Sequence, residues 1–174
     1  MAQGQVRLAG MGEIVQARGG GVIGCIGLGS CVGTLLFDPR THSAVLAHVM
    51  LPEAHDHDAA QQPGKYATTA LPVLLRMLDA SPTTASRLRA VLIGGGELFR
   101  NRSQALRIGE RNVETLYRLL NELRIGIVYE HTRGNTGRSF EFDVATGWIK
   151  VRAVGAEAVE RDLAAALGIQ RKAA

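Results

Sequence analysis

The sequence predicts an α+β fold built as a single domain. Apolar segments of strand type outnumber segments with helical spacing, and most of the strand-type segments follow one another directly along the chain. The length of 174 residues fits one domain that buries a core without metals or disulfides. We therefore expect layers of sheet and helix around one core, rather than a doubly wound parallel sheet.

The first strands are predicted where apolar runs are bounded by glycine or proline. Gly27–Ser30 predicts a tight loop between the first two of these strands, and Glu53–Gly64 is polar enough to predict a surface loop after the third. The three predicted strands are Val22–Ile26, Val32–Phe37 and Ala44–Leu51.

Two segments have apolar residues at helical spacing. Lys65–Leu78 predicts a helix with one buried face, although Pro72 inside it predicts a kink or an early break. Asn112–Leu123 shows the clearest helical pattern in the chain. Further strands are expected at Arg89–Ile93, Gly126–Glu130, Ser139–Asp143 and Trp148–Val154, and a C-terminal helix at Glu157–Leu167.

The composition excludes several classes of protein. The net charge is +4, but the basic residues are scattered among acidic ones with no run of five like charges, so we expect no nucleic-acid partner. No apolar run is long enough to span a membrane and the N-terminus lacks a signal-peptide core, so we expect a cytoplasmic protein without membrane insertion. The two cysteines, Cys25 and Cys31, should stay reduced there.

The segment Gly27–Cys31 is the first candidate site. Its glycines permit a turn that presents Cys31 at the start of a strand, and the N–H groups near Gly29 and Ser30 can converge on an oxyanion. Free cysteines are often small buried hydrophobic residues, so this segment alone leaves both interpretations open.

His48 lies in an apolar run, where an imidazole is costly to bury without a partner. If Val32–Phe37 and Ala44–Leu51 pair as an antiparallel hairpin, the chain doubles back and brings His48 near Cys31. A Cys–His pair supplies the thiolate that acyl transfer needs. Such a pair should also lower the pKa of Cys31 below the ordinary value of about 8.5.

Six segments in sequence order carry a resemblance to one known family. Together they resemble CheD, the chemoreceptor glutamine deamidase, over about residues 10–154, with residues 155–174 as a C-terminal helix or tail. The segments are GLGSCV (27–32), AHVMLP (47–52), PGKYA (63–67), GGGELF (94–99), IGERNVE (108–114) and FDVATG (142–147).

The resemblance implies a three-layer α-β-α sandwich with a mixed, largely antiparallel sheet, similar to toxin-type Cys–His deamidases. It implies deamidation of receptor glutamines through a cysteine thioester, without a cofactor, and it places the nucleophile at Cys31 and its base at His48. The family usually has a threonine where this chain has Cys25. A backbone carbonyl could then orient His48 instead, Cys25 could do so weakly, or activity could be reduced.

The resemblance also implies partners. The substrates would be cytoplasmic helices of methyl-accepting chemotaxis receptors, and a CheC-type phosphatase is a second possible partner. We expect a shallow cleft flanked by the glycine loops, with Leu28, Gly95 and Phe99 contacting substrate or partner. The alternative function is a non-catalytic docking module that binds and tunes such a phosphatase.

Overall fold

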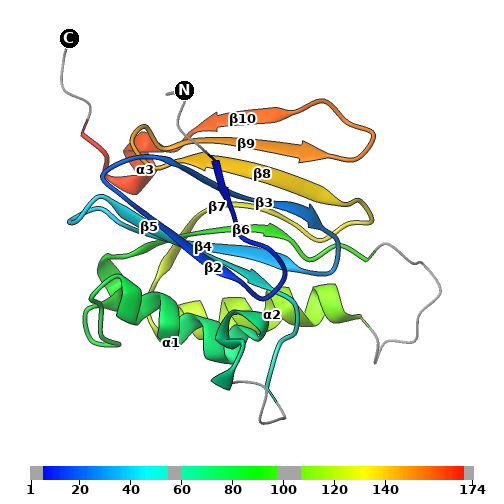
Figure 1. The fold of residues 1–174 in the computed structure, drawn as a ribbon, viewed down its shortest axis with the longest axis horizontal. Coiled ribbons are helices and arrows are strands. Elements are labelled where there is room, and N and C mark those ends of the chain that lie inside the picture. Colours follow the sequence, from blue (N-terminus) through cyan, green and yellow to red (C-terminus); the bar gives the residue numbers. More distant parts are fainter. Residues whose placement is uncertain (1–5, 55–59, 98–106, 171–174) are drawn as a thin grey trace.

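The computed structural model describes residues 6–54, 60–97 and 107–170 as two mixed β-sheets and a helical layer (Figure 1). The sheet in the middle of the molecule, here the central sheet, has the strand order β2-β5-β4-β6-β7. The other, here the outer sheet, has the order β1-β3-β8-β9-β10. The central strands are β2 (Ile14–Arg18), β5 (Ser43–Val49), β4 (Val32–Asp38), β6 (Arg89–Gly94) and β7 (Gly126–Thr132). The outer strands are β1 (Val6–Leu8), β3 (Val22–Leu28), β8 (Arg138–Asp143), β9 (Trp148–Ala153) and β10 (Val159–Asp162).

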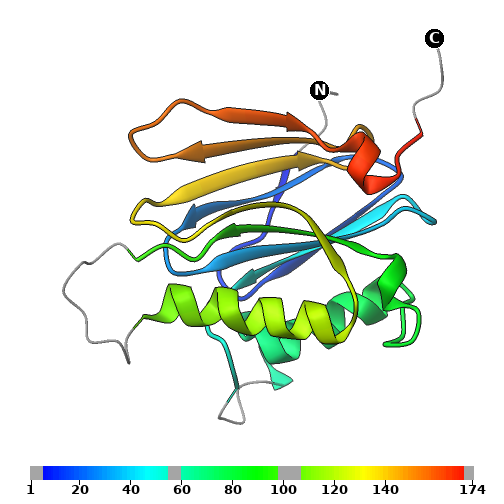
Figure 2. The same ribbon diagram turned by 180° about the vertical axis from the view of Figure 1, so that it is seen from behind.

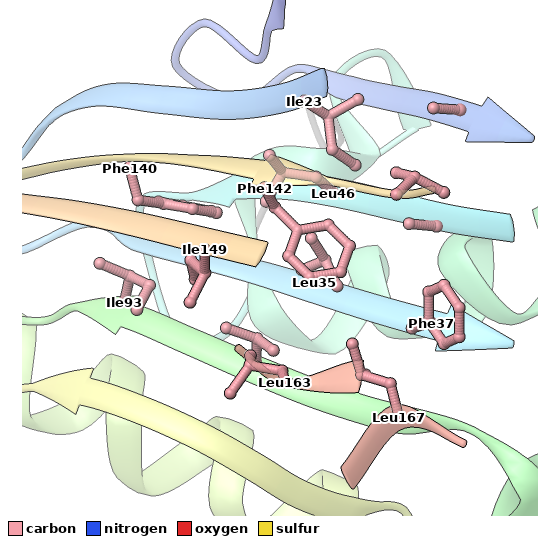
Figure 3. Packing of buried hydrophobic residues seen from close by; sticks show 14 of the residues in the cluster. Ile23, Leu35, Phe37, Leu46, Ile93, Phe140, Phe142, Ile149, Leu163 and Leu167 are labelled. Carbon is pink, nitrogen blue, oxygen red and sulfur yellow. The ribbon is translucent and has the colours of Figure 1, made fainter. Parts of the chain in front are cut away.

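Helices α1 (Ala67–Met77) and α2 (Ile108–Glu122) cover one face of the central sheet, as Figure 2 shows from behind. The outer sheet covers the opposite face. Strands β4 and β5 are therefore buried on both sides along their whole length, which explains their continuous apolar runs. Aromatic rings fill the space between the sheets, chiefly Phe37, Phe140 and Phe142 (Figure 3).

The α+β class and the mixed sheets are confirmed, but the order of the layers differs from the expected helix–sheet–helix. In the described residues the order is helix, sheet, sheet. One reason is the segment Glu157–Leu167, where we predicted a helix. Its part Val159–Asp162 extends the outer sheet as β10, in which Val159 pairs with Val151. Only a single helical turn, α3 (Ala164–Leu167), follows before Gly168 ends it with a left-handed φ of 72°.

Two further differences concern local elements. Strands β1 and β2 at the N-terminus were not predicted, because β1 is short and exposed and β2 carries polar residues. The early break at Pro72 does not occur: α1 continues to Met77 with the proline ring exposed. Proline removes one backbone donor from the helix, and the buried leucines of α1 hold the helix on the central sheet despite that loss.

The predicted hairpin is confirmed and determines where the candidate site lies. β4 and β5 pair antiparallel, with Gly33 directly opposite His48. β6 pairs antiparallel with the other edge of β4, so that Gly94 lies opposite Val32. The start of β4, the end of β5 and the end of β6 therefore meet at one end of the central sheet, where the loop carrying Cys31 also lies.

Candidate active site

The pairing of Gly33 with His48 places Cys31 and His48 on the same face of the central sheet. Residues two apart on a strand point to the same side, so Cys31 lies on the same side as Gly33. Because Gly33 is directly opposite His48, the Cys31 position is diagonal to His48 on that side. This side faces the outer sheet, because Cys31 packs against the cluster between the sheets. A side chain at Gly33 would lie 2.5 Å from Cε1 of Phe140, so glycine is required for the two sheets to approach here.

The His48 imidazole is almost fully buried and held by one hydrogen bond. Nδ1 lies 3.1 Å from the carbonyl oxygen of Ala9. A carbonyl only accepts, so Nδ1 carries the proton and Nε2 keeps its lone pair. Nε2 is buried and has no hydrogen-bond partner among the described residues, Cys31 included. Burial lowers the pKa of His48 below its ordinary value, outweighing the Ala9 hydrogen bond and the charge of Glu13. At neutral pH His48 is a neutral base with a free acceptor nitrogen.

The N-terminal segment fixes His48 through its main chain as well. The N–H of Gly12 donates to the carbonyl of His48, and the N–H of His48 donates to the carbonyl of Glu13, both at 3.1 Å. No role in the site was predicted for this segment. Its contribution comes from backbone groups, which every residue carries, so no side-chain pattern could have revealed it.

Three hydrogen bonds hold carbonyls of the segment Gly27–Cys31, here called the nucleophile loop after the predicted nucleophile Cys31. Gly96 N–H donates to Gly29 and Gly95 N–H to Cys31, both at 2.8 Å, while Nδ2 of Asn112 donates to Ser30 at 2.9 Å. In a trans peptide the N–H of the next residue points opposite to the carbonyl. The N–H groups of Ser30 and Cys31 are therefore directed away from the groups that hold the loop. Neither donates to another residue within the described parts of the chain, although the N–H of Cys31 interacts with its own thiol. Backbone N–H groups in such a position can bind an oxyanion.

Asn112 on α2 links the two halves of the site, and its role was missed. Asn112 was not predicted as a site residue, because the apolar pattern of α2 identifies the buried face of the helix without showing what that face contacts. The residue is fully buried, and Nδ2 donates to the carbonyls of both Ser30 and Met50 at 2.9 Å. One carbonyl immediately precedes Cys31 and the other follows His48 by two residues. Asn112 is therefore a positioning residue for the predicted nucleophile and base.

Comparison with known proteins identifies the family. A family model described as CheD chemotactic sensory transduction matches residues 50–153. A probable chemoreceptor glutamine deamidase CheD from Pyrococcus abyssi is 40% identical, over 87% of this chain and 94% of its own length.

The chain belongs to the CheD family.

The chemoreceptor glutamine deamidase CheD from Thermotoga maritima is 38% identical, over 86% of this chain and 92% of its own length. A probable CheD from Clostridium botulinum is 34% identical over 87% of this chain. These alignments extend well beyond the segment that the family model matches. Within the residues that the structure describes, no helix has the length and apolar character to cross a membrane.

Cys25 occupies the position where the CheD resemblance predicts a threonine, and the structure places it in the core. It is fully buried on β3 opposite Phe140. Burial raises the pKa of its thiol to about 12, with the charge of a Cys31 thiolate as a further cause. Because His48 Nδ1 bonds to Ala9, the backbone-carbonyl alternative accounts for its orientation. We therefore expect Cys25→Thr to leave kcat within about threefold of wild type, and a larger gain would reassign the orienting role to this position.

Two other residues predicted to contact partners are buried. Leu28 is a core residue with no exposed surface, which contradicts its assignment to a contact surface. Gly95 is also buried, and a side chain there would lie 2.4 Å from Cγ2 of Val113, so its role is close backbone packing. Phe99 lies outside the described residues. The exposed apolar residue beside the loop is instead Ile26, at 62% exposure.

The expected lowering of the Cys31 pKa is wrong for this structure. Cys31 is half-buried, and burial raises the pKa of its thiol above the ordinary value, outweighing the opposing effect of its own N–H. A neutral imidazole contributes no positive charge that would stabilise a thiolate. In the free protein Cys31 and His48 are therefore both uncharged at neutral pH.

Alkylation by iodoacetamide tests these protonation states. The Cys31 rate should rise with pH to a midpoint above that of an ordinary cysteine, because a raised pKa leaves less thiolate at neutral pH. Cys25 should react far more slowly at every pH, since it is buried and its pKa is about 12. Peptide mapping after timed labelling separates the two sites. A Cys31 midpoint below 8 would instead demonstrate a preformed thiolate–imidazolium pair.

Removing the Asn112 amide should lower both stability and turnover. Asn112→Ala leaves two buried carbonyls without their donor, which should cost about 2–4 kcal/mol in the free energy of unfolding. We expect kcat to fall at least about tenfold at temperatures where the variant is folded, because the loop and the base lose their common support. Leu116→Ala, one helical turn further along α2, is the matched control. It should lose comparable stability but keep its kcat, and equal losses in both variants would remove the positioning role.

Proposed function

We propose that this chain is a cytoplasmic protein-glutamine deamidase that converts specific glutamines of chemotaxis receptors to glutamate. The names of the Pyrococcus and Thermotoga relatives support the reaction and the substrate. The observation that carries the chemical part is the hydrogen bond from His48 to Ala9, which leaves Nε2 as a free base on the face that Cys31 shares.

The first half of the reaction forms a thioester. Nε2 of His48 takes the proton of the Cys31 thiol as the sulfur attacks the carboxamide carbon of the substrate glutamine. The carbonyl electron pair moves to oxygen, and the N–H groups of Ser30 and Cys31 stabilise the resulting oxyanion. The tetrahedral intermediate then re-forms its carbonyl, the C–N bond breaks, and the His48 imidazolium gives its proton to the departing ammonia.

The second half restores the enzyme. Neutral His48 takes a proton from water, and the hydroxyl attacks the thioester carbon. The C–S bond breaks, the sulfur recovers a proton from His48, and the product is a glutamate side chain. In this scheme Nε2 of His48 carries out every proton transfer. This agrees with the hydrogen bond of Nδ1 to the carbonyl of Ala9, which leaves Nε2 as the nitrogen that can exchange protons. The Cys–His chemistry proposed here is of the kind expected for toxin-type deamidases.

The direct test is incubation of the purified protein with cytoplasmic fragments of chemotaxis receptors. We expect stoichiometric ammonia release, together with the mass change of a glutamine-to-glutamate conversion at defined positions. A protein that binds such fragments, or a CheC-type phosphatase, without releasing ammonia would instead be the docking module considered from the sequence.

A further inference from the structure

Arg138 is a buried guanidinium that the proposed reaction does not use. It begins β8 and is 6% exposed, and it shares a strand face with Phe140 and Phe142, so its side chain faces the central sheet. Within the described residues its side chain makes one hydrogen bond, from Nη1 to the carbonyl of Thr136 at 3.0 Å. Nε is buried and has no partner among the described residues.

No carboxylate compensates this charge within the described parts of the chain. None of the ion pairs found there includes Arg138, and burial is the cause that lowers its pKa. The nearby titratable groups do not neutralise the Arg138 charge either. His131 has its own pKa lowered by burial and by the charge of Arg138, and Glu141 is paired with Arg152 at 3.3 Å. Burying a guanidinium without a counter-ion is costly, so this arrangement favours an anion that arrives from outside.

Arg138 lies beside the nucleophile loop. An open cavity of about 320 Å³ is lined by Arg138, by Gly27 and Gly29 of that loop, and by Arg152 and Val154. A side chain at Gly96 would lie 3.4 Å from Nη1 of Arg138, and the N–H of Gly96 donates to the carbonyl of Gly29. The same cavity thus adjoins both the buried cation and the loop that carries Cys31.

We propose that Arg138 and this cavity form a subsite for a carboxylate of the substrate, supplied by an acidic side chain that flanks the target glutamine on the receptor helix. A planar guanidinium can bind a carboxylate through two parallel hydrogen bonds, which a neutral carboxamide matches poorly. Val154 lines the cavity and is 74% exposed, and Ile26, 62% exposed, adjoins Gly27; both suit the apolar part of an approaching helix. The inference rests on the proposed function.

A double-mutant cycle tests the subsite. Wild-type protein first identifies a deamidated glutamine in a receptor cytoplasmic fragment, and each acidic residue within about one helical turn of it is then changed to its amide. Arg138→Gln is assayed on all fragments by kcat/KM. Arg161→Gln is the matched control, because Arg161 is exposed on β10 and is not among the residues that line the cavity.

For one acidic position, we expect neutralisation to lower wild-type kcat/KM by about tenfold to a hundredfold and to leave Arg138→Gln almost unaffected. Arg161→Gln should behave as wild type. If Arg138→Gln does not fold, Arg138→Lys replaces it and should show a smaller dependence on the same position, because it retains charge but not the planar fork. Equal dependence on flanking acids in wild type and variant would overturn the subsite while leaving deamidation established.

The newly formed glutamate is the other possible source of a carboxylate. If the subsite served the product, deamidated fragment would inhibit wild type strongly and Arg138→Gln weakly, and neutralising the flanking acids would have no effect on either protein. That outcome would overturn the assignment to a flanking acid. Absence of any deamidation by wild type would instead contradict the proposed function itself.

Discussion

Replacing Cys31 by alanine should abolish deamidation while leaving the fold intact. Loss of a covalent nucleophile costs on the order of 10⁴-fold or more in kcat, because neither the base nor the oxyanion donors can act without it. The fold should persist because Cys31 is only half-buried and its carbonyl keeps the hydrogen bond from Gly95. Ammonia release and fragment mass measure the first effect, and circular dichroism with thermal unfolding measures the second.

The second cysteine provides the control for this variant. Cys25→Ala removes a buried thiol from the core between the sheets, so it should lose some stability but keep activity within about tenfold of wild type. Deamidation at the wild-type rate by Cys31→Ala, or loss of deamidation in a folded Cys25→Ala, would show that the nucleophile has been assigned to the wrong sulfur.

Replacing His48 by glutamine should lower kcat by roughly 10²- to 10⁴-fold, the usual range for loss of a general base. Cys31 should remain alkylatable at high pH in this variant, because hydroxide then removes the thiol proton without help.

In the wild-type protein kcat/KM should fall in acid with a midpoint below 6.5, since His48 has a lowered pKa and loses its free lone pair only as the pH drops through that pKa. An acid midpoint above 6.5, or full activity in His48→Gln, would exclude His48 as the base.

The sequence predicted the elements whose burial follows a simple period. The central strands β4, β5 and β6 and the helices α1 and α2 lie within a few residues of their expected positions, because each is covered on a face that its apolar residues define. The apolar pattern did not predict the strands that bury few apolar side chains. Strand β1 is exposed throughout, and β10 is held mainly by backbone pairing to β9, so neither leaves a periodic signal.

The residues of the site were also only partly predictable from the sequence. The antiparallel hairpin of β4 and β5, from which we expected His48 to lie near Cys31, is confirmed, because pairing between consecutive strands follows from local signals in the sequence. Leu28 was wrongly expected at the surface. A shift of register between Cys25 and Leu28 changes the alternation of β3, so Ile26 and Gly27 are both exposed while Leu28 turns into the core. The carbonyl of Ala9 and the amide of Asn112 act across 39 and 82 positions of sequence, distances at which composition and spacing predict nothing.

The covalent intermediate is tested most directly by adding hydroxylamine to the reaction with receptor fragments. A thioester at Cys31 is attacked by hydroxylamine as well as by water, so the target glutamine should be converted to a mixture of hydroxamate and glutamate, with the hydroxamate share rising with hydroxylamine concentration. The Cys31→Ala variant should yield neither product. Formation of glutamate alone at every hydroxylamine concentration, while turnover continues, would contradict a cysteine thioester and with it the central claim.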